Sequence, residues 1–294
     1  MSTNRRQFVQ SFAALGAAVA VSAKGATAAA NPAEDKSGPY DKFPSLKVEL
    51  KGPVATVTIS NVDLLPQRGE RGNQEHWEMG ELLSQMRGDN NIRVVVLTGP
   101  GNGIFHAGKH QPGGAKPVPP DQEDEWFDFR GIRRIHQEMA ESEKIFVAKV
   151  NGNAVSMGSS LVFASDIIVA REDAMIADFH LGDDGTGVVP GDGGCALVPL
   201  FMTPVKAKEY LLLGKQYTAA ELARLGIINY AVPAAKLDAT VDDIVARLLK
   251  RPVYALAWAK RVANKRVTDH LNLTLDAASA YEQLNKLHEK KTAL

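Results

Sequence analysis

The chain has 294 residues, enough for one large domain or for a domain with a helical extension. Lysine and arginine balance aspartate and glutamate at 34 each, without a long block of either sign, which argues against nucleic acid or anionic lipid as a partner. A small neutral molecule is the expected partner. Cys195 is the single cysteine, which excludes an intramolecular disulfide, and its apolar neighbours favour packing over a role as a nucleophile.

The first 30 residues have the form of an export signal. Arg5 and Arg6 precede an apolar, alanine-rich run over residues 12–21, and small residues at 26–30 suit a signal peptidase. The paired arginines favour a twin-arginine signal over an ordinary secretory signal or a disordered basic tail. We therefore expect a mature protein that is periplasmic or secreted and has no membrane insertion.

Three further regions are predicted after the signal. Residues 31–45 are polar, with proline and glycine, and predict a linker. Residues 46–235 carry alternating strand and helix patterns, beginning with a hairpin over 46–50 and 54–59, a helix over 75–86 and a buried strand over 93–97. Residues 100–120 predict a long loop. A helix through Phe129 and Met139 and a strand over 145–150 follow.

The second half of the chain becomes progressively helical. A buried helix is expected over 157–165, and short strands over 167–170 and 175–177. Thr203 with Pro204, and the capping box that begins at Thr218, start two more helices. Helices at about 237–249, 253–267 and 271–288 make residues 236–294 a C-terminal helical region. The pattern predicts an α/β fold.

Five motifs then identify a family resemblance. Their order and spacing resemble the crotonase (enoyl-CoA hydratase/isomerase) superfamily over about residues 46–290. The motifs are Arg93-Val-Val-Val-Leu-Thr-Gly99, Phe105-His-Ala-Gly108, Ala148-Lys-Val-Asn-Gly152, Ser165-Asp-Ile-Ile-Val-Ala170 and Val189-Pro-Gly-Asp-Gly-Gly194.

The resemblance implies a crotonase-like spiral of ββα units with a C-terminal helical region for oligomerisation, as a homotrimer or a dimer of trimers. It also implies an oxyanion hole of two backbone N–H groups, at Ala107 and Met157, that stabilises an enolate. A helix that starts at Met157 adds its positive end. No cofactor is implied. Because coenzyme A is a cytoplasmic carrier, an exported member is expected to act on another substrate.

Ser160 and His180 stand where hydratases of the superfamily have two glutamates. Water addition to a double bond then lacks its usual acid and base. The replacements resemble β-diketone hydrolases of the 6-oxocamphor hydrolase type, which implies that His180, Asp192, His76 and Glu282 are the catalytic residues. That type has a histidine where this chain has Met157, so substrate fit is expected to differ.

The expected reaction is retro-Claisen cleavage of a 1,3-diketone. A neutral imidazole at His180 takes a proton from water, and Asp192 on its other nitrogen orients it. Hydroxide adds to one carbonyl, and the C–C bond breaks to release an enolate. His76 and Glu282 could bind the second carbonyl, deliver the last proton or shape the pocket.

Several alternatives stay open. Asp183 or Asp184 could replace Asp192 as the partner of His180. His106 and His110 have a spacing that a metal site could use, although their glycine-rich setting argues against one. The chain could instead be an acyl-CoA hydratase, isomerase or thioester hydrolase, for which Lys109 and Lys116 offer few cations near a polyphosphate. A non-catalytic binding module is the third possibility.

Overall fold

The computed structural model describes residues 38–43, 45–59, 74–101, 103–106, 122–182 and 187–292. The predicted export signal, Ala107 and the lysines and histidine that follow it, and Asp183 and Asp184 lie outside the described residues. The chain divides into residues 1–37 and residues 38–294, and the description concerns the second unit. Within the described residues, none of the helices has the length and apolar character that crossing a membrane requires.

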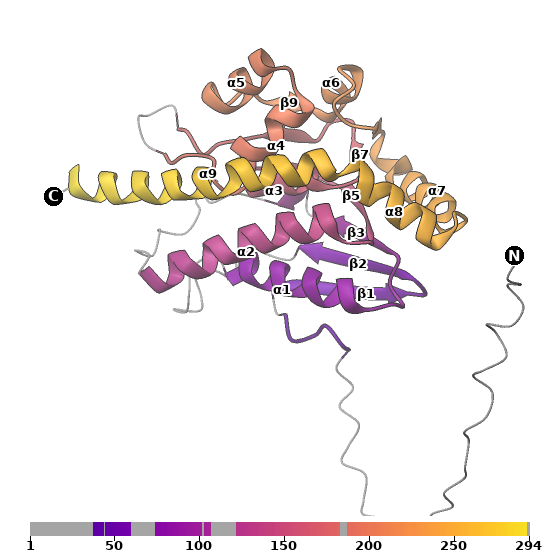
Figure 1. The fold of residues 1–294 in the computed structure, drawn as a ribbon. Coiled ribbons are helices and arrows are strands. Elements are labelled where there is room, and N and C mark those ends of the chain that lie inside the picture. The colour runs from indigo at the N-terminus through magenta and orange to yellow at the C-terminus, as the bar shows by residue number, and fades with distance from the viewer. Residues whose placement is uncertain are drawn as a thin grey trace, which may run out of the picture. The chain divides into compact units, whose positions relative to one another are not determined.

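A six-stranded sheet forms the centre of this unit (Figure 1). Its strand order is β1-β2-β3-β5-β7-β10, with β1 antiparallel to β2 and the remaining neighbours parallel. The predicted hairpin at the start of the core is therefore confirmed. The strands are β1 (Leu46–Lys51), β2 (Val54–Ile59), β3 (Val94–Thr98), β5 (Ile145–Val150), β7 (Ile167–Arg171) and β10 (Tyr230–Val232).

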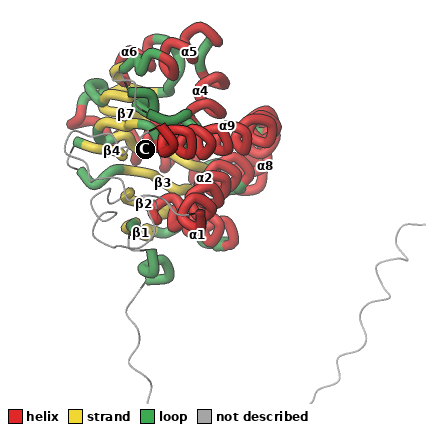
Figure 2. Tube along the Cα trace, turned by 90° about the vertical axis from the view of Figure 1, so that its left-hand side faces the viewer, coloured by secondary structure: helices red, strands yellow, loops and turns green. Residues whose placement is uncertain are grey.

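Both faces of the large sheet are covered, as a parallel sheet requires. Along β3, Val94 and Val96 point to the side chains of α7 (Leu237–Leu249), whereas Val95 and Leu97 belong to the main core. That core also receives apolar side chains from α1 (Gln74–Gly88), α2 (Gln122–Glu141) and α3 (Met157–Ala164). Figure 2 shows α1 and α2 packed side by side on the helical side of the sheet.

A second, four-stranded sheet has the order β4-β6-β8-β9. Its strands are β4 (Ile104–His106), β6 (Asn153–Val155), β8 (Met175–Ala177) and β9 (Tyr217–Thr218). β4 lies inside the segment predicted as a long loop, so that prediction is wrong for these three residues. β6 runs directly into α3, and β8 runs into residues 178–180. The small sheet thereby brings two chain segments side by side, since β6 and β8 are paired neighbours.

Helices make up most of the remaining chain. The predicted starts at Thr203 and Thr218 are confirmed as N-caps, the second with its full capping box. The helices are α4 (Gly194–Phe201), α5 (Pro204–Leu212), α6 (Ala219–Arg224), α7, α8 (Val253–Ala263) and α9 (Lys265–Thr292), and a 3-10 turn spans Ala234–Lys236. α4 was not predicted, because it contains Pro199 and is apolar all round.

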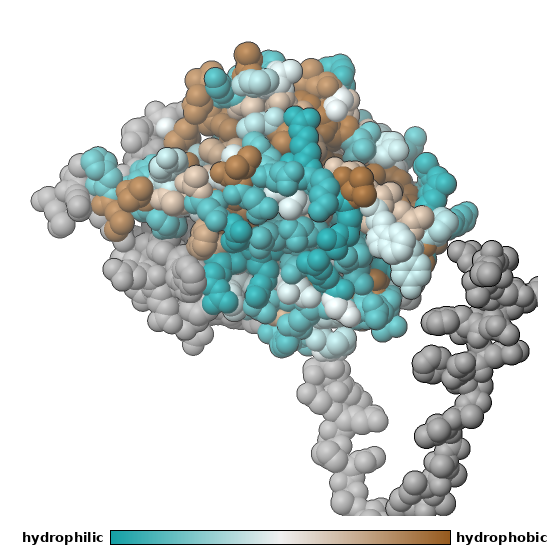
Figure 3. Space-filling model, in the orientation of Figure 1, coloured by the Kyte–Doolittle hydropathy of each residue, from teal (hydrophilic) through white to brown (hydrophobic). Residues whose placement is uncertain are grey.

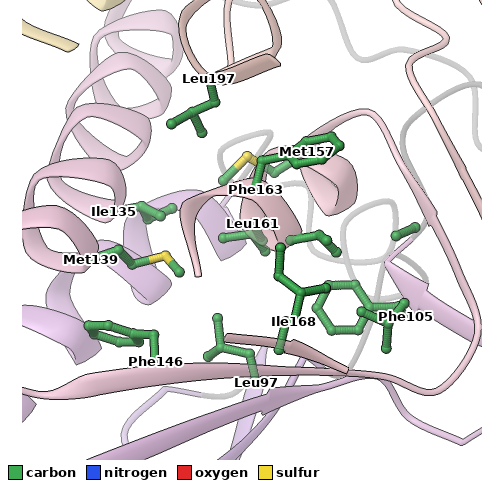
Figure 4. Packing of buried hydrophobic residues seen from close by; sticks show 14 of the residues in the cluster. Leu97, Phe105, Ile135, Met139, Phe146, Met157, Leu161, Phe163, Ile168 and Leu197 are labelled. Carbon is green, nitrogen blue, oxygen red and sulfur yellow. The ribbon is translucent and has the colours of Figure 1, made fainter. Parts of the chain in front are cut away.

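The core itself is densely apolar. Figure 4 shows Leu97 and Phe146 of the large sheet facing Leu161 and Met139 of the covering helices, with Met157 close to Phe163. All of these side chains are almost fully buried.

The predicted linker over residues 31–45 is wrong for its last residues. Tyr40 and Phe43 are buried in the main core, and the Tyr40 hydroxyl donates to Asp89 Oδ2 at 2.8 Å. The Ser45 amide donates to Glu78 Oε2 at 2.7 Å. Two aromatic side chains bury enough apolar surface to order a polar stretch, which composition alone does not reveal.

Candidate active site

The centre of the candidate site is the short segment that leaves β8. Asp178 Oδ1 accepts two hydrogen bonds from His180, one from the backbone N–H at 3.0 Å and one involving Nδ1 at 2.8 Å. Both residues are buried. A carboxylate that accepts from the backbone N–H two residues on closes an Asx-type turn, and this turn brings the ring of His180 to the same oxygen. The position of His180 is thus fixed by its own chain neighbour.

The segment that begins at Gly187 brings Asp192 to the other ring nitrogen of His180. Leu181 pairs with Gly187, and the Val188 amide donates to the His180 carbonyl at 2.8 Å. Gly187 has φ 126°, and a Cβ atom there would collide with the His180 carbonyl oxygen. The returning chain then places Asp192 Oδ2 3.2 Å from His180 Nε2.

His180 therefore lies between two carboxylates. Sequence analysis predicts Asp192 as the orienting partner, and the structure brings the two together. That prediction is incomplete, because Asp178 makes the shorter contact, on Nδ1. An orienting carboxylate on one nitrogen and a second carboxylate on the other form a continuous Asp178–His180–Asp192 relay.

The electrostatics of the relay favour a protonated ring. Burial by itself would lower the pKa of His180, but the charges of Asp192 and Asp178 outweigh it and raise the pKa well above 6.5. Burial would raise the pKa of Asp192, yet the charge and hydrogen bond of His180 hold it well below its usual range. The two carboxylates therefore stabilise the imidazolium that forms when His180 accepts a proton.

Two further side chains fix Asp192. Ser160 Oγ donates to Asp192 Oδ1 at 3.2 Å, so the residue that replaces a hydratase glutamate supports the carboxylate instead. His136 Nε2 lies 2.7 Å from the Asp192 carbonyl oxygen and donates to it. Burial lowers the pKa of His136, which keeps that ring neutral. Asp192 is consequently held by both its backbone and its side chain.

His76 and Glu282 also lie at this site. His76 is buried on α1, close enough for its charge to influence both Asp192 and His136. Glu282 is buried on α9, beside Gly191, and its Oε1 forms an ion pair with Lys286 Nζ at 2.9 Å. The structure thus gathers all four predicted catalytic side chains around one turn of the chain.

One of the two predicted oxyanion donors is described. Met157 is the first residue of α3, next to the strand end that carries Asp178 and His180, and its side chain is buried in the core (Figure 4). Ala107 lies outside the described residues. The positive end of α3 therefore lies beside the relay.

Asp178, His180 and Asp192 are also the group of described residues that could hold a metal ion, since they offer ligand atoms within 4.8 Å of one another. Both ring nitrogens already face carboxylates, so a metal would have to replace one of these contacts. A hydrogen-bonded relay accounts for the geometry without that replacement.

Cys195 is half-buried near the relay. Burial, with the charge of Asp178, raises the pKa of its thiol to about 11. A thiol that stays protonated is a poor nucleophile, in agreement with the packing role predicted from the sequence.

Sequence reasoning missed Asp178 and His136. The signal for Asp178 was its spacing, since an aspartate side chain commonly accepts a hydrogen bond from the backbone two residues on. His136 had no comparable signal, because an isolated histidine in a helix resembles any buried polar residue.

The comparisons with known proteins agree with this architecture. A family model described as enoyl-CoA hydratase/isomerase matches residues 73–293. A carnitinyl-CoA dehydratase from Salmonella typhi is 28% identical over 218 residues, which cover 74% of this chain and 79% of the relative.

Solved structures extend the likeness. An enoyl-CoA hydratase/isomerase from Mycobacterium paratuberculosis has 30% sequence identity and a TM-score of 0.70, covering 82% of this chain and 93% of that one. A beta-diketone hydrolase from the cyanobacterium Anabaena has 20% identity and a TM-score of 0.72, covering 87% and 99%. At 20% identity, the likeness to the beta-diketone hydrolase shows that the two chains share a fold and nothing further.

The sheets, the helix beside the histidine relay and these matches define an enzyme of the crotonase superfamily. The chain belongs to the enoyl-CoA hydratase/isomerase family, and the predicted crotonase-like α/β fold is confirmed.

Proposed function

We propose that the chain is a β-diketone hydrolase that cleaves a C–C bond of a 1,3-diketone. The observation that carries the proposal is the Asp178–His180–Asp192 relay, with Ser160 supporting Asp192. A hydratase needs a pair of carboxylic side chains that exchange protons with water and substrate. Here the two carboxylates are engaged with an imidazole, an arrangement suited to activating one water molecule.

In the proposed reaction, the proton acceptor is His180 in the form in which Nε2 has lost its proton. Asp178 holds Nδ1 of the ring, so that Nε2 is the nitrogen that exchanges the proton. Water loses a proton to the relay, and its oxygen adds to one carbonyl carbon. The C–C bond then breaks, its electron pair leaves as an enolate, and the same proton returns to the enolate carbon. One diketone and one water give one carboxylic acid and one ketone, joined in one molecule when the substrate is cyclic.

The oxygen of the departing enolate would be held by the amides of Met157 and Ala107. Preorganised donors of this kind contribute about 3–4 kcal/mol each in a site that excludes water. His76 and Glu282 are proposed to complete the pocket, since the charge of His76 influences Asp192 and Glu282 lies against Gly191. No cofactor is required by this scheme.

The site residues support a second candidate less well, although the relatives favour it. The carnitinyl-CoA dehydratase and the enoyl-CoA hydratase/isomerase are named for acyl-CoA chemistry. An acyl-CoA hydratase or thioester hydrolase is therefore the alternative. The fold alone would also suit a non-catalytic binding module, but such a module has no need of a buried charged relay.

Location and assembly are part of the proposal. Arg5 and Arg6 in the leading segment support twin-arginine export to the periplasm or beyond the cell. Large apolar side chains are exposed in the second half of the chain, among them Leu213 at the end of α5, Trp258 on α8 and Leu273 on α9, at 74%, 63% and 79%. Figure 3 shows apolar residues gathered over α5 and α6 at the top of the view. Such surfaces support self-association, and the family resemblance makes a homotrimer or a dimer of trimers the proposed assembly.

The test is turnover of a panel of cyclic and acyclic 1,3-diketones, followed as loss of enol absorbance in the ultraviolet. His180→Ala serves as the inactive variant, and crotonyl-CoA and acyl-CoA thioesters are assayed in parallel. Diketone cleavage that is lost in His180→Ala supports the proposal. If the wild-type enzyme hydrates or hydrolyses the CoA esters and leaves every diketone intact, the protein is instead an acyl-CoA hydratase or thioester hydrolase.

A further inference from the structure

Ser156 has an unusual backbone conformation. Its φ is 50° and its ψ is −115°, and among the described residues it is the one non-glycine residue with a positive φ. A side chain is disfavoured in this region, where glycine is the usual occupant. Such strain persists where the surroundings enforce it. A serine at this position therefore calls for a compensating contact.

The hydroxyl of Ser156 supplies that contact. Ser156 Oγ accepts a hydrogen bond from the Phe179 amide at 3.3 Å. The Ser156 amide donates to the Ala177 carbonyl at 3.0 Å, and its carbonyl accepts from the Ser160 amide at 3.1 Å. Ser156 is buried, with 4% of its surface exposed. Glycine at this position would keep the two backbone contacts and lose the contact to Phe179.

These contacts link the two halves of the site. Met157, the proposed oxyanion donor, directly follows Ser156, and Phe179 lies between Asp178 and His180. The hydroxyl thereby ties the turn that aims the oxyanion donor to the segment that carries the base. A displacement of about 1 Å between such groups costs about 10²-fold in rate.

We propose that Ser156 is a positioning residue, whose side-chain hydroxyl sets the distance between the enolate-binding amide of Met157 and the ring of His180. The inference rests on the proposed function for its choice of substrate. It rests on the structure alone for the Ser156–Phe179 contact. The strain at φ 50° is retained because the hydroxyl is needed there.

Two variants separate positioning from stability. Ser156→Gly removes both the strain and the hydroxyl, so we expect a melting temperature equal to or above that of the wild type. Ser156→Ala keeps the strain and removes the hydroxyl, so we expect a lower melting temperature. For both variants we expect kcat to fall about ten- to hundredfold with KM changed less than threefold. Ser165→Ala is the matched control, because that buried hydroxyl donates to the Leu161 carbonyl at the far end of the same helix.

Kinetics are measured on whichever substrate the wild type turns over, a diketone or crotonyl-CoA, since both pass through an enolate. Failure of the diketone assay therefore leaves this comparison intact. Hydrogen–deuterium exchange of the peptide that contains Phe179 is measured in parallel and should accelerate in both Ser156 variants. The inference is overturned if Ser156→Gly keeps kcat within twofold of the wild type, or if exchange at Phe179 is unchanged.

Discussion

Replacing Asp178 with asparagine tests the relay most directly. The change removes one negative charge 2.8 Å from His180 Nδ1 and leaves the shape of the side chain nearly intact. Because the charge of Asp178 contributes to the raised pKa of His180, that pKa should fall in the variant. The ring then loses its proton at a lower pH and is a weaker base.

The magnitude follows from the contact that is weakened. A hydrogen bond to a charged group contributes about 1.5–3 kcal/mol, against about 1 kcal/mol for a neutral one. The difference of about 0.5–2 kcal/mol in imidazolium stabilisation lowers the rate roughly two- to thirtyfold. If the asparagine amide turns its N–H₂ group toward Nδ1, the ring adopts the wrong tautomer and the loss approaches about 10⁴-fold.

The assay is the pH dependence of kcat/KM for diketone cleavage. In the wild type, activity should rise with pH along a limb above 6.5, because the base form of His180 appears only above its raised pKa. In Asp178→Asn the limb should move to lower pH and the plateau should fall. Asp173→Asn, which alters an exposed carboxylate paired with Arg171, is the control and should keep the wild-type profile. An unmoved limb in Asp178→Asn would falsify the relay.

The pH dependence of the free energy of unfolding tests the raised pKa of His180 independently of catalysis. The pKa of His180 is raised in the folded protein, so its contribution to stability is fully present below the unfolded value of about 6.5 and is lost as pH rises through the folded value. Urea unfolding should therefore show the largest difference between wild type and Asp178→Asn in weakly acidic solution. A difference that grows on the alkaline side would contradict the sign.

Three further changes have predicted outcomes. Gly193→Ala should destabilise the fold by about 1–3 kcal/mol in urea unfolding. The cause is that φ of Gly193 is 126° and that the new Cβ would lie 2.5 Å from His136 Nε2. A loss below about 0.5 kcal/mol would be evidence against this tight packing. Lys260→Met should cost about 3 kcal/mol by the same assay, since it removes the ammonium now 2.8 Å from Asp166, whose side chain is 14% exposed. An unchanged unfolding midpoint would contradict this expectation. Glu282→Gln should change KM or product protonation more than melting temperature, and an effect on melting temperature alone would limit Glu282 to a structural role.

Most of the fold was predictable, because the local sequence patterns agree with the tertiary structure in most of the described chain. The hairpin, the buried strand at β3 and the capping box at Thr218 all have short-range signals. The signals failed where tertiary contacts decide the structure. Tyr40 and Phe43 lie in a polar segment and are ordered by burial, and α4 forms around Pro199 in an apolar environment.

The site was predictable where residue identity carries the chemistry. His180 and Asp192 are in contact, and His76 and Glu282 lie beside them, as the resemblance implied. Which aspartate contacts which ring nitrogen was not predictable, because it depends on the pairing of Gly187 with Leu181 in the folded chain. Sequence spacing places Asp192 far from His180, and only the folded turn shows which ring nitrogen each carboxylate reaches.

The contact between α9 and the turn before Asp192 has a consequence for the order of events during synthesis. Ser279 Oγ donates to the Gly191 carbonyl at 2.9 Å, and Glu282 lies against the same glycine. The strands of both sheets leave the ribosome before this helix does, and chain elongation proceeds at about 5–20 residues per second. The turn before Asp192 therefore lacks its contacts with Ser279 and Glu282 for several seconds after both sheets have been synthesised.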